Sequence, residues 1–312
     1  MNILLAGGAG DVGTHLNDFF CRSGHQVVIV DKQQYVSAGL LADNVTFYEK
    51  DLTDAYALKR IVTDHAIDVI VDLAWSFADN PRVLFEQDIV GQINLMEAAV
   101  EGGVKRFIYT STAGVYGTPM LQPIVEEQTC RPELARKPLY SVAKLAAEQL
   151  GLAWGVQYKL LATVIRFWWA FGDTIGGKHL RALVEAALKD EPIRLVAGAG
   201  GAFTSMDDLA VSVELAAGKE AAIGQTYNIA SLFLTWQEIS AMLIELTGSK
   251  SQVVMVDSSI WSGPAFLAER WQLSWEKVAR ELGYKPLIKP DQAKVSFQRA
   301  LAHCVDQVRE HM

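Results

Sequence analysis

The stretch Asn2-Ile-Leu-Leu-Ala-Gly-Gly-Ala-Gly-Asp-Val-Gly13 decides the fold of this chain. Its apolar start, residues 2–6, is typical of a strand buried on both faces of a parallel sheet. Glycines then recur in a GxxGxxG pattern, and an amphipathic segment follows until Gly24. This order predicts a strand, a tight turn and a helix whose N-terminal N–H groups bind a pyrophosphate. The predicted cofactor-binding positions in this stretch are Gly7, Gly10, Asp11, Val12 and Gly13.

An acidic residue further along supports a dinucleotide over the alternative that these glycines only shape a turn. Asp31 ends the next predicted strand, residues 26–30, about 20 residues beyond the turn, where the motif places a ribose-binding acid. A carboxylate there accepts both ribose hydroxyls and repels a 2′-phosphate, a repulsion that Lys32 would partly offset. The sequence therefore predicts NAD as the cofactor and disfavours NADP.

Strand and helix segments continue to alternate after this point. Apolar strands are predicted at 45–48, 69–73 and 107–110, with helices at 55–65 and 89–99 between them. This alternation predicts an α/β fold, a Rossmann doubly wound parallel sheet with a smaller C-terminal α/β substrate domain. Ligands of such sheets bind beyond the carboxyl ends of the strands, so one crevice should be faced by Asp51, Leu52, Leu73, Ala74, Trp75, Ser111 and Thr112. For the apolar members, core packing is the alternative.

The composition and charge of the chain limit the kinds of binding partner that it is expected to have. The chain of 312 residues is 50% hydrophobic and 21% charged, and its formal net charge is -8. An acidic balance argues against nucleic acid or an anionic membrane and favours a small molecule. Three widely spaced cysteines and scattered histidines predict neither disulfides nor a metal site. The apolar start is too short for a signal peptide, so we expect a cytoplasmic protein.

A second motif carries the chemistry. Tyr140 and Lys144 stand one helical turn apart, so their side chains can meet. A nearby ammonium is expected to lower the pKa of the tyrosine towards that of a useful base, and Lys144 is also suited to hold the cofactor ribose. The hydroxyl of Thr112, just beyond a strand, is placed to hydrogen-bond the oxygen of a reacting alcohol or carbonyl. A half-buried helix tyrosine is the alternative for an isolated YxxxK match.

The match is not isolated, because the chain resembles the extended short-chain dehydrogenase/reductases, the NAD-dependent epimerase/dehydratase group. The resemblance covers nearly the whole chain, and Thr112, Tyr140 and Lys144 fall on the catalytic positions of that family. Asp51-Leu52 matches its adenine-contacting pair. Further matches are Leu73-Ala74-Trp75, Asp88-Ile-Val-Gly91, Asn94-Leu-Met-Glu-Ala-Ala99, Met206-Asp-Asp-Leu-Ala210, Tyr227-Asn-Ile229 and Glu281-Leu-Gly-Tyr-Lys-Pro286.

The resemblance also implies an organisation. Residues 1–165 should form the NAD-binding domain, which the chain rejoins at about 204–230, and residues 166–203 and 231–312 should form the substrate domain. Dimers are common in this family, and the helices at 89–100 and 139–154 are the expected contact.

Several positions depart from the family pattern. Trp169 stands where sugar-nucleotide members have a diphosphate-binding asparagine, and the segment 198–205 lacks their arginine. Asp88 replaces an asparagine of the family, and Ala113 follows Thr112 where the dehydratases have an Asp-Glu pair, so dehydration is disfavoured. Aromatic side chains are predicted to line a flat substrate pocket together with Thr112 and Ala113, namely Trp75, Phe77, Phe167, Trp168 and Trp169, of which Phe167 also reaches the cofactor. Core packing is the alternative for most of them.

The predicted activity is proton transfer by Tyr140 with hydride transfer between NAD and a secondary alcohol carbon of a sugar or sugar nucleotide. If NADH stays bound and returns its hydride to the opposite face, the protein is an epimerase. If the cofactor exchanges, it is a dehydrogenase or reductase of a free sugar, a cyclic alcohol or an aromatic alcohol. A non-catalytic NAD-sensing protein is the alternative of another class.

Overall fold

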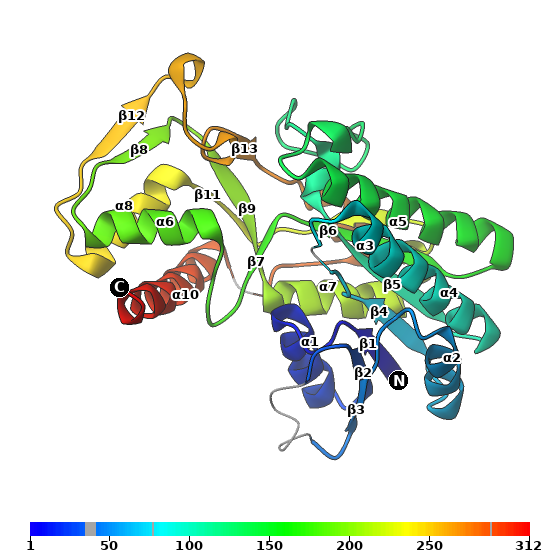
Figure 1. The fold of residues 1–312 in the computed structure, drawn as a ribbon. Coiled ribbons are helices and arrows are strands. Elements are labelled where there is room, and N and C mark those ends of the chain that lie inside the picture. Colours follow the sequence, from blue (N-terminus) through cyan, green and yellow to red (C-terminus); the bar gives the residue numbers. More distant parts are fainter. Residues whose placement is uncertain (35–41, 77, 288) are drawn as a thin grey trace.

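The structure is a computed structural model that describes residues 1–34, 42–76, 78–287 and 289–312. Two lobes lie side by side in Figure 1. One is built on a seven-stranded sheet, and the other carries smaller sheets with the helices α6 (Lys178–Leu188), α8 (Trp236–Thr247) and α10 (Pro290–Glu310). Phe77, predicted to line the pocket, lies outside the described residues.

The large sheet has the order β10-β6-β5-β4-β1-β2-β3. All of its neighbouring strands are parallel. The chain therefore starts in the middle, winds to one edge and then to the other, which confirms the predicted Rossmann doubly wound sheet. The strands are β1 (Asn2–Ala6), β2 (Gln26–Asp31), β3 (Val45–Glu49), β4 (Val69–Asp72), β5 (Arg106–Thr112), β6 (Ala162–Phe167) and β10 (Thr226–Asn228).

Helices cover both faces of this sheet, and β1 shows why. Its side chains alternate between two buried clusters: Ile3 and Leu5 join one, Leu4 and Ala6 the other. The first cluster includes side chains of α1 (Asp11–Arg22), α7 (Met206–Gly218) and α9 (Glu276–Leu282). The second includes side chains of α2 (Ala55–Asp64), α4 (Gly91–Glu101) and α5 (Pro138–Tyr158). A strand covered on both faces must be apolar throughout, as residues 2–6 are.

The helix predicted at 89–99 is organised differently at its start. A short helix, α3 (Pro81–Phe85), runs into a π-helical turn at Glu86–Val90, and α4 begins only at Gly91. Gly91 lies against Leu52, because a Cβ added at this glycine would be 2.9 Å from the Leu52 Cβ. Close packing at this position requires the absence of a side chain.

The second lobe has its own core. In its four-stranded sheet, β9 (Gly200–Ser205) pairs with β7 (Trp169–Phe171), β11 (Leu232–Thr235) and β13 (Arg270–Trp271), while β8 (Ile193–Val196) pairs with β12 (Val253–Val256). Its core includes Trp236 and Phe297. Between these elements the chain returns to the first lobe, where β10 pairs with β6. The assignment of the lobes to cofactor and substrate stays a prediction.

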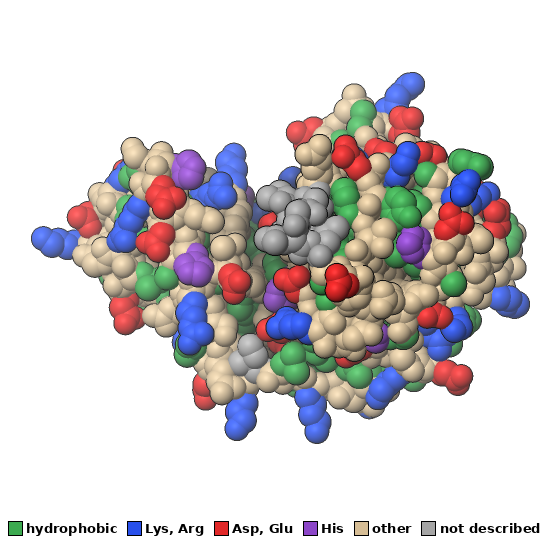
Figure 2. All heavy atoms as spheres, turned by 90° about the horizontal axis from the view of Figure 1, so that it is seen from below, with side chains coloured by type: hydrophobic (Ala, Val, Ile, Leu, Met, Phe, Trp, Pro, Cys, Tyr) green, Lys and Arg blue, Asp and Glu red, His purple; other side chains and the backbone are tan. Residues whose placement is uncertain are grey.

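Figure 2 shows the molecule from below, with acidic and basic side chains interspersed over this face. Among the described residues, no helix combines the length and the apolar composition that crossing a membrane requires. Cys21, Cys130 and Cys304 are free thiols.

Candidate active site

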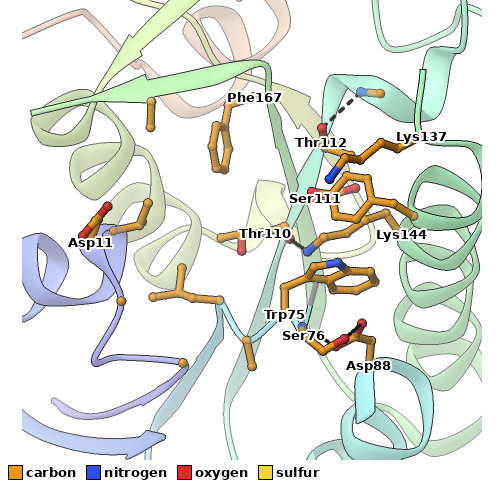
Figure 3. A pocket seen from close by; sticks show the side chains of 18 of the residues that line it. Asp11, Trp75, Ser76, Asp88, Thr110, Ser111, Thr112, Lys137, Lys144 and Phe167 are labelled. Carbon is orange, nitrogen blue, oxygen red and sulfur yellow. Dashed lines mark hydrogen bonds between the residues drawn. The ribbon is translucent and has the colours of Figure 1, made fainter. Parts of the chain in front are cut away.

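A cavity of about 1190 Å³ opens at the carboxyl ends of the sheet strands and extends to the second lobe. It lies at the switch point between β1 and β4, where the strand order reverses. Figure 3 shows Asp11 on one side of it and Thr112, Lys137 and Lys144 on the other. Among the described residues, all of the predicted site residues except one line it: Gly7, Gly10, Asp11, Val12, Gly13, Asp31, Lys32, Asp51, Leu52, Leu73, Ala74, Trp75, Ser111, Thr112, Tyr140, Lys144, Phe167, Trp168 and Trp169.

The exception is Ala113, which was predicted to line the substrate pocket. Its side chain is fully buried in a cluster with Val115, Tyr116 and Ile124 and does not line the cavity. Residues 113–116 form a short 3-10 helix directly after β5, capped by the Thr112 side chain, which accepts a hydrogen bond from the Gly114 N–H. This turn directs Ala113 away from the cavity.

Some glycines of the turn are required by the packing of the turn itself, and one is not. Gly7 has a φ of +76°, and a Cβ at Gly13 would lie 2.4 Å from the Gly8 Cα, so the turn itself excludes side chains at both positions. At Gly10 an added Cβ would meet nothing closer than the Gly7 oxygen at 3.7 Å. Packing within the protein therefore does not require a glycine at position 10. Since Gly10 lines the cavity at the N-terminus of α1, a ligand that approaches the backbone there would explain it.

Asp31 lies at the end of β2 and is held by the backbone. Its Oδ2 accepts a hydrogen bond from the Ala9 N–H and its Oδ1 one from the Gln33 N–H, both at 2.9 Å. The neighbouring Lys32 donates to Gln87 Oε1 at 2.8 Å. Asp31 is thus fixed beside the glycine turn, while Lys32 is engaged across the cavity.

Tyr140 is half-buried, and its surroundings reverse one expectation. From the sequence, Lys144 is expected to lower the pKa of Tyr140. In the structure burial raises the pKa of Tyr140 to about 12, although a hydrogen bond with Thr112 acts to lower it. The Asp88 carboxylate adds to the rise, because it disfavours a second negative charge nearby. Thr112 and Tyr140 are therefore hydrogen-bonded to each other, a contact that was not predicted from the sequence, and burial favours the phenol form of Tyr140.

Lys144 is buried between polar and aromatic groups. Its Nζ donates to the Thr110 carbonyl oxygen at 2.9 Å and lies 4.0 Å from the ring centroid of Trp75 and 4.8 Å from that of Tyr109. Burial lowers the pKa of Lys144, whereas nearby carboxylates, first that of Asp72, act to raise it. The ammonium is thus stabilised by a carbonyl, two ring faces and distant negative charge.

Two acidic residues near Lys144 were not given a catalytic role from the sequence. Asp72, at the end of β4, is 2% exposed, and its Oδ1 accepts a hydrogen bond from the Ala74 N–H at 3.1 Å. Burial raises the pKa of Asp72, and Lys144 acts to lower it. Asp88 accepts two hydrogen bonds from Ser76, one from its N–H and one from its hydroxyl, each at 2.7 Å. The signal that could have drawn attention to Asp72 is an acidic residue inside the apolar run 69–73.

The aromatic residues form a wall at the second lobe. The ring of Trp168 stacks at 21° on the rings of Phe266 and Trp271, and that of Trp169 packs against Gly177. A Cβ at Gly201 would lie 1.7 Å from Trp168 Cζ3. Gly201 belongs to the segment 198–205, in which the resemblance expects an arginine. The Trp168 ring therefore covers part of that segment.

A buried ion pair contacts Ser111, one of the residues that line the cavity. Arg166 on β6 binds Glu148 on α5, with Nη2 to Oε2 at 2.6 Å and Nε to Oε1 at 3.0 Å. The Ser111 hydroxyl also donates to Glu148, and Arg166 Nη1 donates to the Tyr116 hydroxyl at 3.0 Å. Ser111 therefore lines the cavity while its hydroxyl proton is directed into the protein. The two charges are 18 residues apart, so no local pattern in the sequence revealed the pair.

Comparison with known proteins agrees with this geometry. Residues 3–230 match the NAD dependent epimerase/dehydratase family. The chain belongs to this family. Among its relatives, the UDP-glucose 4-epimerase of Halalkalibacterium halodurans is 35% identical over 170 residues, which is 52% of this chain and 49% of that protein. The chain thus spans about half the length of the curated relatives it matches.

Solved structures confirm the fold over the whole chain. The UDP-glucose 4-epimerase of Thermotoga maritima, solved with UDP-glucose, has a TM-score of 0.79 at 24% identity and covers 100% of this chain and 99% of its own. The UDP-glucose 4-epimerase of Thermus thermophilus, solved with NAD, has a TM-score of 0.75 at 23% identity and covers 100% of both chains. The likeness in fold therefore includes the residues after 230, which lie outside the family match.

Proposed function

We propose that this protein is an NAD-dependent oxidoreductase or epimerase that acts on a secondary alcohol carbon of a sugar or sugar nucleotide. The observation that carries the proposal is the meeting of Thr112, Tyr140 and Lys144 in the cavity that also holds the glycine turn. A base, an orienting hydroxyl and a cation thus share one space with a dinucleotide motif. Membership of the NAD dependent epimerase/dehydratase family supports it.

The residues present fit NAD. Gly10 leaves the backbone open at the N-terminus of α1 for a pyrophosphate, and Asp31 offers a carboxylate to a ribose. NAD supplies a hydride acceptor when bound. Lys144 would hold the second ribose and place positive charge near Tyr140, and Trp75 and Phe167 would border the reacting ring.

The chain's own residues then handle the proton. Tyr140 accepts the proton of the substrate hydroxyl, and Thr112 donates a hydrogen bond to the same oxygen. With a pKa of about 12, Tyr140 would be a poor base at neutral pH. Positive charge brought beside the phenol would favour the phenolate. Activation of Tyr140 is therefore proposed to depend on a bound cofactor.

Replacing Tyr140 by phenylalanine tests the proposal. We expect Tyr140→Phe to lose about a hundredfold or more in turnover, the usual contribution of a general base, while NAD still binds. The matched control is Tyr158→Phe at the exposed end of the same helix. Turnover by Tyr140→Phe equal to that of the control would refute the assigned base, and binding of NAD without any turnover in the unsubstituted protein would favour a sensor.

A second candidate is a dehydrogenase or reductase of a substrate without a nucleotide. It is favoured by Trp169, which stands at the position of the expected asparagine, and by Trp168, which covers Gly201. Two diphosphate contacts are thereby replaced by aromatic surface. Steady formation of NADH with a free alcohol would support this candidate, whereas tightly retained NAD without net NADH would support the epimerase.

We further propose that the protein acts as a cytoplasmic homodimer. The expected contact, α4 and α5, leaves apolar side chains exposed, among them Val100, Leu139 and Val156. Free thiols suit a reducing compartment. Light scattering after size-exclusion chromatography tests the oligomeric state, and a monomer at micromolar concentration would refute the dimer.

A further inference from the structure

Basic side chains gather at the substrate end of the cavity. Arg136 and Lys137 directly precede α5, and Lys178 and Arg181 lie in the first turn of α6, so the two pairs come from different lobes. Within the described parts of the chain, none of the four forms an ion pair with a carboxylate. Glu269 lines the same end and accepts a hydrogen bond from Trp271 Nε1 at 2.8 Å.

Two of these basic side chains lie close to features described above, the aromatic wall and Thr112. The Arg136 guanidinium carbon is 5.0 Å from the ring centroid of Phe266, and the ring of His179 is 4.9 Å from that same centroid. In Figure 3 the side chain of Lys137 points into the cavity on the side of Thr112. One cation thus sits at the aromatic wall and another beside the predicted reaction centre.

The neighbourhood of His179 shows that positive charge accumulates here. Burial lowers the pKa of His179, and the charges of Arg136 and Lys178 lower it further. Like charges that converge on one cavity from two lobes repel each other, and an anion placed among them relieves that repulsion. All four basic side chains are exposed, so solvent screens part of this repulsion, and an anionic substrate would relieve more of it than a neutral one.

We propose that the substrate ring itself carries an anionic group, a carboxylate or a phosphate monoester, which Lys137, Arg136 and Lys178 bind. The inference rests on the proposed function, because it takes Thr112 and Tyr140 as the reaction centre. The position of Lys137 places the anion near the reacting carbon. The aromatic surface of Trp168 and Trp169 lies where the resemblance expects diphosphate contacts, so a nucleoside diphosphate is not the anion that this arrangement selects.

Ligand binding in the presence of NAD tests the charge requirement without turnover. The probes are glucose, glucuronate, glucose 6-phosphate and UDP, and the readouts are thermal stabilisation and quenching of tryptophan fluorescence. We expect glucuronate or glucose 6-phosphate to bind and glucose not to bind, with affinity that falls as salt rises. Which of the two binds separates carboxylate from phosphate. Equal binding of glucose, stronger binding of UDP, or no response to either acid at millimolar concentration would each overturn the proposal.

Charge removal locates the site. Lys137→Met and Lys178→Met should each weaken binding of the anionic probe by about tenfold, the effect of losing a charge-assisted hydrogen bond, and leave NAD binding unchanged. Lys189→Met, at the far end of α6, is the matched control. Unchanged affinity in both test variants would overturn the assignment. Since binding needs no base, Tyr140→Phe should still bind the probe, and the failure of either proposal can be told from that of the other.

Discussion

The Lys144 ammonium lies 4.0 Å from the centre of the Trp75 ring, and the same ring is edge-on to Tyr140 at 5.3 Å between centroids. One indole therefore contacts both members of the proposed catalytic pair. Because a ring face favours a cation, Trp75 opposes the loss of charge that burial imposes on Lys144.

The contact predicts a change in the pH profile when the ring is removed. A cation–π contact in a desolvated site contributes about 1–2 kcal/mol to the charged form, so Trp75→Leu should lower the pKa of Lys144 by about one unit. The alkaline limb of the turnover profile should then move to lower pH. Trp75→Phe keeps a ring above the ammonium and should shift less. Identical profiles for the two variants would mean that the ring acts through shape alone.

Two glycines of the turn should respond differently to alanine. Gly13→Ala places a methyl group 2.4 Å from the Gly8 Cα and should lower the melting temperature of the ligand-free protein. Gly10→Ala meets no such clash, so its stability should stay within about 1 kcal/mol of the original, while NAD binding weakens. Thermal unfolding and NAD titration measure the two effects. Normal NAD affinity in Gly10→Ala would place the pyrophosphate elsewhere.

Asp31 should govern the choice between NAD and NADP. Asp31→Ser removes the charge that repels a 2′-phosphate and one strong acceptor for a ribose. We expect about tenfold weaker binding of NAD and tighter binding of NADP, measured by fluorescence titration of both. An unchanged ratio of the two dissociation constants would show that Asp31 serves only its backbone partners Ala9 and Gln33.

The buried ion pair predicts a large loss of stability from a small change. Glu148→Gln leaves the Arg166 charge buried without its carboxylate and should cost about 3–5 kcal/mol in urea unfolding. The matched control is Asp64→Asn, which breaks the exposed pair with Arg60 and should have little effect. If both variants unfold at the same urea concentration, the buried pair is compensated by other contacts.

Asp88 should make stability depend on pH. Burial raises the pKa of Asp88 in the folded protein, so the folded state holds this proton more tightly than the unfolded chain. Its contribution is therefore most favourable below the unfolded pKa and is lost as pH rises through the folded value. Asp88→Asn should match the original protein at acidic pH and gain stability relative to it towards neutrality. A difference that does not vary with pH would contradict this.

The sequence by itself determined the fold and the part of the cavity lining that belongs to the glycine turn, the strand ends and the Tyr140–Lys144 helix. The apolar run 2–6 predicts a strand covered on both faces, and the glycine spacing, Asp31 and the Tyr140–Lys144 interval are local patterns whose geometry follows from short-range backbone rules. The prediction that Ala113 lines the substrate pocket was wrong, because a 3-10 turn reorients the residue that follows Thr112.

Tertiary structure alone decided the electrostatics. Four features depend on residues that are not neighbours in the sequence. They are the raised pKa of Tyr140, the closeness of Asp72 to Lys144, the pairing of Glu148 with Arg166 and the meeting of Arg136 with His179. A pKa depends on how much water packing removes and on which charges replace it. Neither quantity is encoded in local spacing, so the same Tyr140 and Lys144 that the sequence places one helical turn apart acquire their chemistry only from the residues that surround them.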